Sequence, residues 1–402
     1  MTPDDLRFLL SPAGQSALEA LADAPLTPDT HLATAAALRQ HLSPERAAAV
    51  LETALLRQRA ARKFSRAGRM LFTRAGLEQA TAEPMAAHRA RRYAAAGAQR
   101  IADLGCGIGG DGLALAATGA AVVALDREWL HTAMTGANAE AYDVREQVMP
   151  VQADLLELSP LPVEAFFFDP ARRTATGPRL APGRRLHTAD DYQPPLRLID
   201  AWRPVVPDGA AKVSPGIDYA ELPDGAEIEF VSYEGEVREG VCWFGRLRTA
   251  AARRATLLPG GHTLTDEGEA VTACGQPRGY LLEPDGAVIR AHLVGQLAAQ
   301  LGATLIDPTI AYLTADTPTA TPFARAYRIE DALPFQLKRL RHYLRERNVG
   351  QVTIKKRGSP LDPDILRQDL RLHGPSHRVI FLTQVLGKPA VLIGQALEAR
   401  TA

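Results

Sequence analysis

The stretch that decides the fold is residues 100–127, RIADLGCGIGGDGLALAATGAAVVALDR. It starts with a short apolar run, passes through four closely spaced glycines and continues with apolar residues at helical spacing. A second apolar run, residues 121–125, ends at Asp126. This order of strand, glycine-rich turn, helix and strand predicts a nucleotide-binding βαβ unit.

The glycines let a ligand approach the backbone closely, but their spacing fits two different ligands. Gly105, Gly107 and Gly110 satisfy the dinucleotide fingerprint, and the same turn satisfies the Gly-x-Gly-x-Gly loop of S-adenosylmethionine enzymes. Asp103 favours the second ligand. A carboxylate two residues before the first glycine attracts a cationic amino-acid group and repels a pyrophosphate.

Two further acids follow the next predicted strands. Asp126 ends the second strand and can accept hydrogen bonds from both ribose hydroxyls, while Asp154 follows the third apolar segment and can reach an adenine amino group. Three acids at successive strand ends fit a ligand with a sulfonium and an ammonium group, so we expect S-adenosylmethionine as cofactor. The alternative is a generic doubly wound turn in which these acids are incidental.

At these residues the sequence resembles the class I S-adenosylmethionine-dependent methyltransferases. The loop from Gly105 to Asp111, Gly-Cys-Gly-Ile-Gly-Gly-Asp, is similar to that of the trimethylguanosine synthases and of a bacterial group with a THUMP-like C-terminal domain. The likeness to the bacterial group extends over nearly the whole chain. It implies that Gly105, Gly107, Gly109 and Asp111 contact the cofactor.

The resemblance also implies the fold class and its division into domains. We expect an α/β class I methyltransferase with a Rossmann-like, seven-stranded sheet over residues 98–260. A helical N-terminal domain over residues 1–97 would precede it, and a small α+β THUMP-like domain over residues 276–402 would follow it.

The N-terminal region is rich in Ala, Leu, Arg and Glu, with apolar residues at helical spacing. In the bacterial group a helix near residue 81 can cover the methionine end of the cofactor. Thr81 is therefore either a cofactor contact or only a helix cap. A basic run in this region is either a solvated helix face or an RNA site. Its members are Arg57, Arg59, Arg62, Lys63, Arg66 and Arg69.

Asp169 and Pro170 follow the apolar run 163–168, at the place where open α/β sheets bind their ligands. Amino-directed methyltransferases have Asn, Asp or Ser before two prolines and an aromatic residue here. The resemblance therefore implies that Asp169 and the Pro170 carbonyl orient a target amine. Because an alanine and then Arg172 replace the second proline and the aromatic residue, Arg172 or Arg173 would contact the substrate instead. Asp169 could alternatively be a buried structural partner of Arg173.

Positive charge is concentrated at the C-terminal end of an otherwise neutral chain. The whole chain has 46 Lys and Arg against 46 Asp and Glu, but residues 321–402 have 15 against 7. A turn with Lys355, Lys356 and Arg357 suits contacts to RNA phosphates. The alternative is a solvated basic surface. The resemblance to THUMP, an RNA-binding module, favours RNA.

Composition limits the remaining choices. A 46% hydrophobic content over 402 residues is enough for two or three packed domains. Three distant cysteines, no signal-like start and no apolar run of membrane length indicate a cytoplasmic protein without membrane spans. No metal is expected, because the one close histidine pair, His373 and His377, encloses a glycine and a proline.

We therefore expect an enzyme that transfers a methyl group from S-adenosylmethionine to a base nitrogen in RNA. Two alternatives remain open at this point: a methyltransferase that acts on a protein or small molecule, and a non-catalytic RNA-binding protein that has kept the fold. The sequence leaves the oligomeric state undetermined.

Overall fold

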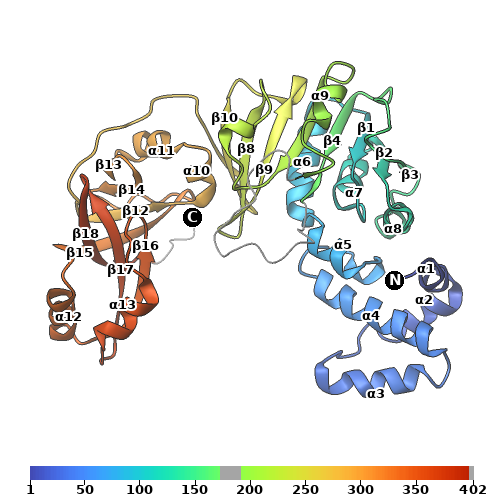
Figure 1. Ribbon diagram of the computed structural model, residues 1–402, viewed down its shortest axis with the longest axis horizontal. Coiled ribbons are helices and arrows are strands. Elements are labelled where there is room, and N and C mark those ends of the chain that lie inside the picture. Colours follow the sequence, from blue (N-terminus) through green and yellow to red (C-terminus); the bar gives the residue numbers. More distant parts are fainter. Residues whose placement is uncertain (173–191, 398–402) are drawn as a thin grey trace. The chain divides into compact units, whose positions relative to one another are not determined.

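The computed structural model describes residues 1–172 and 192–397, which form two compact units (Figure 1). The first unit comprises Met1–Glu227 and Gly240–Thr249, and the second comprises Ile228–Glu239 and Ala250–Ala402. The chain therefore enters the second unit once, returns to the first for ten residues, and then continues in the second.

The first unit begins with helices whose starts the sequence specifies closely. Four of them begin with a proline directly after a Ser or Thr, and that hydroxyl accepts a hydrogen bond from a backbone N–H of the first turn. The six helices before the sheet are α1 (Pro3–Leu10), α2 (Pro12–Glu19), α3 (Pro28–Leu38), α4 (Pro44–Ala60), α5 (Arg74–Gln79) and α6 (Glu83–Ala95).

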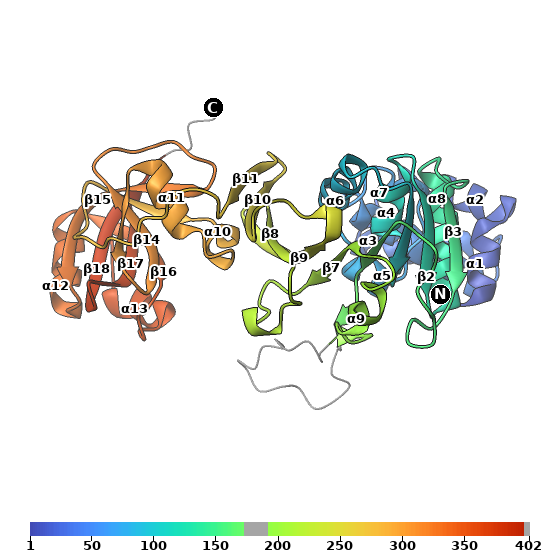
Figure 2. The same cartoon turned by 90° about the horizontal axis from the view of Figure 1, so that it is seen from above.

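The sheet of the first unit has the order β9-β7-β4-β1-β2-β3. Its strands run parallel except β9, which is antiparallel to β7. Helices α7 and α8 lie beside β1–β3 in both views (Figures 1 and 2). The bounds are β1 (Arg100–Leu104), α7 (Gly110–Ala116), β2 (Ala121–Asp126), α8 (Trp129–Ala141), β3 (Val148–Gln152), β4 (Ala165–Phe168), β5 (Ala171–Arg172), β6 (Tyr192–Gln193), α9 (Leu198–Trp202), β7 (Asp208–Val213) and β9 (Glu236–Phe244).

The N-terminal helices and this sheet share one hydrophobic core. Phe64, Phe72 and Tyr93 from the helical region belong to the same buried cluster as Ile101 and Phe167 from the sheet. The helical region therefore packs as part of the first unit. Among the described residues, six strands of this sheet belong wholly or mainly to the first unit, and the chain crosses between the two units at residues 227–240.

The second unit contains a three-stranded set, β11-β10-β8, and a separate seven-stranded sheet in the order β13-β14-β12-β15-β18-β17-β16. In the larger sheet only β16 and β17 pair in parallel. The bounds are β8 (Glu227–Tyr233), β10 (Arg253–Leu258), β11 (His262–Thr265), β12 (Tyr280–Pro284), α10 (Gly286–Arg290), α11 (Val294–Leu301), β13 (Thr304–Asp307), β14 (Ile310–Ala315), β15 (Ala324–Pro334), α12 (Leu337–Glu346), β16 (Val349–Lys356), α13 (Pro363–Leu370), β17 (Ser376–Val385) and β18 (Lys388–Ala396).

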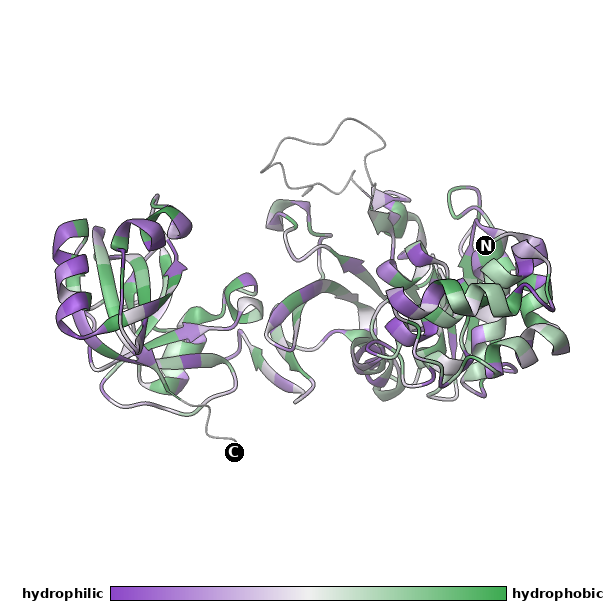
Figure 3. Cartoon of the chain, turned by 90° about the horizontal axis from the view of Figure 1, so that it is seen from below, coloured by the Kyte–Doolittle hydropathy of each residue, from purple (hydrophilic) through white to green (hydrophobic). Residues whose placement is uncertain are grey.

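The hydropathy of the second unit explains where its core lies. Figure 3 shows apolar residues along the strands of the larger sheet and a mostly hydrophilic α12 at the left end of the view. Only Leu340 and Leu344 of that helix are buried, and they pack in a cluster with Ile380 and Ile393. Lys338, Arg339 and Arg345 of α12 are exposed, whereas Arg341 is half-buried and donates a hydrogen bond to the Asp369 carbonyl.

Membrane-spanning helices and metal-binding clusters are both absent from the described residues. Within residues 1–172 and 192–397, none of the helices combines the length and the apolar character needed to cross a bilayer. The same part of the chain contains no group of three or more His, Cys, Asp or Glu side chains that could bind a metal ion.

Candidate active site

The glycine-rich turn connects β1 to α7 and has a backbone that only glycine adopts readily. Gly105, Gly107 and Gly109 have φ values of +89°, +54° and +94°. A Cβ added to Gly105 would lie 3.0 Å from the carbonyl oxygen of Asp169. The turn therefore packs directly against the chain that leaves β4.

Asp103 lies under this turn and is 1% exposed. Its Oδ2 atom has no hydrogen-bond partner within the described part of the chain. Burial raises the pKa of Asp103 well above its ordinary value, and the carboxylates of Asp111, Asp169 and Asp126 raise it further. A bound positive charge would favour the ionised form of this carboxyl group.

Asp126, at the end of β2, fixes the same turn from the neighbouring strand. Its Oδ2 accepts a hydrogen bond of 3.0 Å from the N–H of Gly107, and its Oδ1 accepts one of 2.9 Å from the N–H of Glu128. The Nδ1 atom of His131 lies 3.2 Å from Oδ1, and this contact raises the pKa of His131. Asp126 is 13% exposed, so it retains access for a ligand.

Asp154 follows β3 and is exposed. Its Oδ1 accepts a hydrogen bond of 2.9 Å from the N–H of Leu156. Since β1, β2 and β3 are parallel neighbours, Asp103, Asp126 and Asp154 are all at or beyond the carboxyl end of the same sheet. The structure thus places the three predicted acids along one edge, with Asp103 buried and Asp154 exposed.

Asp111 belongs to the first turn of α7 and forms a buried ion pair with Arg89 of α6. The Arg89 Nε donates a 2.9 Å hydrogen bond to Oδ1, and a second guanidinium nitrogen contacts the same oxygen. The Arg89 guanidinium also lies 5.0 Å from the centre of the Phe167 ring. This pair connects the last N-terminal helix to the helix that follows the glycine-rich turn.

Asp169 and Lys212 form the centre of the candidate site. The Lys212 Nζ donates hydrogen bonds of 2.7 Å to Asp169 Oδ2 and 3.0 Å to Thr81 Oγ1. The Asp169 side chain is 25% exposed and that of Lys212 is 19% exposed, whereas Thr81 is buried. Among the residues that the structure describes, none donates a hydrogen bond to Asp169 Oδ1.

Thr81 does not cap a helix. The N-cap of α6 is Ala82, and no side chain caps this helix. The backbone of Thr81 instead packs on the start of α7, where a Cβ on Gly110 would lie 3.3 Å from the Thr81 carbonyl oxygen. The capping alternative is therefore wrong, and Thr81 joins the glycine-rich turn to Lys212.

The remaining predicted substrate residues near Asp169 are described only in part. Pro170 is buried. Arg172 ends the two-residue strand β5, which pairs with β6, and Arg173 lies outside the described residues. The alternative pairing of Asp169 with Arg173 therefore stays untested, and the partner that the structure gives Asp169 is Lys212.

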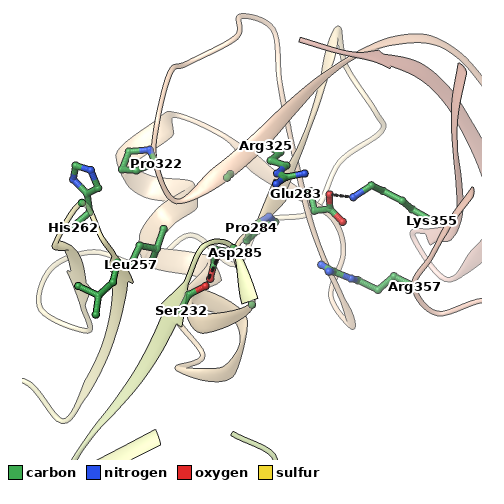
Figure 4. Close-up of a pocket in the computed structure, with 15 residues that line it drawn as sticks. Ser232, Leu257, His262, Glu283, Pro284, Asp285, Pro322, Arg325, Lys355 and Arg357 are labelled. Atoms are coloured by element: carbon green, nitrogen blue, oxygen red, sulfur yellow. Dashed lines mark hydrogen bonds and ion pairs between the residues drawn. The ribbon is translucent and has the colours of Figure 1, made fainter. Parts of the chain in front are cut away.

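Lys355 and Arg357 lie in the second unit, where they line a cavity of about 550 Å³ (Figure 4). Lys355 contacts the Glu283 carboxylate; although burial alone would lower the pKa of Lys355, Glu283 and Tyr327 raise it overall. Arg357 donates a 2.5 Å hydrogen bond to the Ala311 carbonyl. Lys356 is exposed.

The cavity has one further cation that the sequence analysis missed. Arg325 is exposed and has no ion-pair or hydrogen-bond partner in the described part of the second unit. The acids of the lining are engaged: Glu283 with Lys355 and the Tyr327 hydroxyl, and Asp285 with the Ser232 hydroxyl and the N–H of Ala287. Arg325 and Arg357 are thus not neutralised by carboxylates.

The fold and these contacts define an enzyme of Rossmann-like architecture with an acidic, glycine-lined site at the carboxyl edge of its sheet. The chain belongs to the S-adenosylmethionine-dependent methyltransferases, because it is 36% identical over 355 residues to members from Mycobacterium tuberculosis strains CDC 1551 / Oshkosh and H37Rv. The match covers 85% of this chain and 94% of each relative, and both relatives are described as uncharacterized.

Three family profiles match parts of the chain. They are described as a domain of unknown function over residues 2–60, RNA cap guanine-N2 methyltransferase over residues 98–178, and THUMP domain-like over residues 324–396. The crystal structure of a candidate methyltransferase from Porphyromonas gingivalis W83 covers 93% of this chain and 100% of its own, with a TM-score of 0.72 and 21% sequence identity. This likeness shows the shared fold. The predicted fold class, family and cofactor are confirmed.

The site also fits S-adenosylmethionine on its own chemistry. Arg89 balances Asp111 and Lys212 balances Asp169, which leaves the buried Asp103 without a cationic partner among the described residues. The cofactor carries the missing positive charge on its sulfonium and ammonium groups. Of the three positive-φ glycines of the turn, Gly105 and Gly107 are half-buried, and a Cβ added to Gly107 would meet nothing within 4 Å, so a ligand can approach the backbone there.

Proposed function

We propose that this methyltransferase acts on RNA and methylates a base nitrogen. The observation that carries the proposal is Asp169, which lies at the carboxyl end of β4 with one carboxylate oxygen bound to Lys212 and the other without a hydrogen-bond partner among residues 1–172 and 192–397. Its backbone contacts the glycine-rich turn at Gly105, so substrate and cofactor sites adjoin. The profile matches to an RNA cap guanine-N2 methyltransferase and a THUMP-like domain support RNA as the substrate class.

The proposed roles follow from these positions. S-adenosylmethionine, when bound, supplies an electrophilic methyl group. Gly105, Gly107, Gly109 and Asp126 would hold its adenosine part, with Asp154 near the base and Asp103 and Thr81 toward the amino acid. Asp111 would act with Arg89 by fixing the start of α7.

Asp169 would accept an N–H of the target amine through Oδ1, assisted by the Pro170 carbonyl, and so fix the direction of the amine lone pair. Lys212 would keep the Asp169 carboxylate in one orientation, and Asp169 would receive the proton that the amine loses late in the reaction. Arg172 and Arg173 would contact the base or its phosphate. Lys355, Lys356 and Arg357, together with Arg325, would bind RNA phosphates elsewhere on the chain.

The test uses total RNA from a strain that lacks the gene as the methyl acceptor. Purified wild-type protein should transfer tritium from labelled S-adenosylmethionine to this RNA, and Asp169→Ala should lose transfer by about 10²-fold or more while still binding the cofactor. Mass spectrometry of the nucleosides then identifies the methylated base. Cofactor binding without transfer to any RNA would leave a protein or small-molecule substrate, or a non-catalytic role, and would overturn the proposal.

A further inference from the structure

The basic run of the N-terminal helical region divides into two groups with different environments. Most of its members hold the fold together. Arg57 donates a 2.8 Å hydrogen bond to the Met70 carbonyl, and burial lowers its pKa to about 10. Lys63 donates to the carbonyls of Leu77 and Ala80 at 2.7 and 3.1 Å, where α5 ends.

Arg66 and Arg69 also have structural partners. Both guanidinium groups pair with Asp143 after α8, and Arg66 donates a 3.1 Å hydrogen bond to the Ala141 carbonyl. These two side chains connect the helical region to the sheet domain. Four of the six basic residues are therefore accounted for by the architecture.

Arg59 and Arg62 are the exceptions. Both are exposed, and neither has a hydrogen-bond or ion-pair partner in the described part of the chain. They line a cavity of about 570 Å³ together with Arg74 and His31. No Asp or Glu is among its described lining residues, and the nearest acidic contact is the 3.1 Å pair of Arg74 with Glu52.

The charges of Arg59 and Arg62 are not compensated by an acid of the described chain, whereas Arg74 is paired with Glu52. Like charges that line one cavity repel each other, and a bound anion removes that repulsion. Arginine matches phosphate in geometry as well as charge, because its planar fork donates two parallel hydrogen bonds. The cavity volume lies in the range of sites that bind ligands of nucleotide size. The three arginines come from different segments: Arg59 from α4, Arg62 from the turn after it and Arg74 from α5. A single solvated helix face would not account for this arrangement.

We propose that this arginine cavity, formed by Arg59, Arg62, Arg74 and His31, binds the phosphate backbone of the RNA substrate. The inference rests on the proposed RNA specificity and assigns a role to a region that includes part of the match to a domain of unknown function, in which Arg59 and His31 lie. The cavity belongs to the same compact unit as Asp169, so RNA bound there lies on the body that carries the candidate active site. Its contacts position the RNA and do not read its sequence.

The test compares two double variants of the full-length protein that lose the same charge. Arg59→Ala/Arg62→Ala removes the two unpaired cations of the cavity. The control, Arg39→Ala/Arg91→Ala, removes two arginines that are also exposed and without partners in the described part of the first unit but do not line the cavity. Circular dichroism and melting temperature should show that both variants fold like wild type.

Binding is measured by fluorescence anisotropy with a labelled 30-nucleotide single-stranded RNA over a series of salt concentrations. The cavity variant should bind about tenfold more weakly. Its slope of log K against log salt should fall in magnitude by about 1.4 to 1.8, since each lost phosphate contact contributes about 0.7 to 0.9. The control should match wild type, and Arg59→Lys/Arg62→Lys should recover most of the slope. Methyl transfer should show a raised KM for RNA with unchanged kcat.

The outcomes separate this proposal from the proposed function. The cavity proposal is overturned if the cavity and control variants have the same RNA affinity and the same slope of log K against log salt, or if wild type does not bind RNA. This holds even if the protein methylates RNA that it contacts through another surface. A smaller slope of log K against log salt in the cavity variant alone supports the cavity proposal, even if wild type transfers no methyl group to RNA. In that case only the assignment of RNA as the methyl acceptor fails. Inorganic phosphate should not compete at concentrations equal to the RNA phosphate.

Discussion

Asp169 and Lys212 are direct neighbours across two parallel strands. Phe168, the last residue of β4, pairs with Ala211 of β7, so the next residues along the two strands are Asp169 and Lys212. Their side chains meet at 2.7 Å between Oδ2 and Nζ. Because Lys212 also donates to Thr81, one ammonium group connects β7, the candidate catalytic acid and the segment before α6.

Loss of this ammonium group should impair methyl transfer more than cofactor binding. Without Lys212 the Asp169 carboxylate can rotate away from the target amine, and a displacement of about 1 Å costs about 10²-fold in rate. We expect Lys212→Met to lower kcat by about that factor, and Lys212→Arg to recover part of it. Single-turnover transfer to RNA and calorimetric titration with S-adenosylmethionine measure the two quantities. An unchanged kcat in Lys212→Met would contradict the positioning role.

Asp103→Asn should have opposite effects on stability and on cofactor affinity. The pKa of Asp103 is raised in the folded state, so the folded protein binds more protons than the unfolded chain between the unfolded and folded pKa values. Stability is thus lost as the pH rises through that window. At neutral pH the free variant should melt at a higher temperature than wild type.

The same change removes the charge that attracts the cofactor. We expect Asp103→Asn to bind S-adenosylmethionine about 10- to 100-fold more weakly, the range for a lost hydrogen bond to a charged group. Melting curves without cofactor test the predicted rise in melting temperature, and calorimetric titrations at the same pH test the predicted loss of cofactor affinity. A variant that is less stable and binds equally well would refute both expectations.

Gly105→Ala should affect the site through Asp169 as well as through backbone strain. The added Cβ would lie 3.0 Å from the Asp169 carbonyl, and φ is +89°. Gly97→Ala is the matched control, because Gly97 has φ +73° and nothing within 4 Å of an added Cβ. Each variant should lose about 1 to 2 kcal/mol of unfolding free energy, but only Gly105→Ala should lose methyl transfer, by tenfold or more.

Much of the first unit could be predicted because its signals are local. The apolar runs and glycines of residues 100–127 predict a strand, a helix and a second strand, and the structure has β1, α7 and β2 there. Asp103 and Asp169 could also be located, because open α/β sheets bind their ligands at the carboxyl ends of the strands. The pairing of Lys212 with Asp169 could not be predicted, since it depends on β4 lying beside β7, which no local pattern reveals.

Other features were missed because the sequence pattern was misleading or incomplete. The helical spacing of Leu333, Leu337, Leu340 and Leu344 predicts a helix that begins at Leu333. In the structure Leu333 belongs to β15, and α12 begins at Leu337. Strand β15 was not predicted, because its charged residues mask the alternation of a strand. The partner of Arg89 could have been anticipated in part. Arg89 lies on the buried stripe of α6 between Met85 and Tyr93, and a buried cation needs an acidic partner inside the protein.

His131 should stabilise the protein in a manner that depends on pH. The Asp126 carboxylate raises the pKa of His131 above its ordinary value of 6.5. The stabilisation is fully present below the unfolded pKa and is lost as the pH rises through the folded pKa. His131→Gln should therefore lower the melting temperature below pH 6, and the difference from wild type should disappear as the pH rises through the folded pKa. The effect should be at most about 1 kcal/mol because the pair is partly exposed. A difference that is constant with pH would show that packing causes it instead.

The buried pair of Arg89 and Asp111 should be costly to break and much less costly to remove. Arg89→Met leaves a carboxylate that is 9% exposed without its partner, which typically costs about 3 to 5 kcal/mol. Arg89→Met/Asp111→Leu removes both charges and should recover most of that loss. Urea unfolding of wild type, both single variants and the double variant completes the cycle. Additive single losses would mean that the two residues stabilise the fold independently, and α6 would then not depend on this ion pair for its attachment to α7.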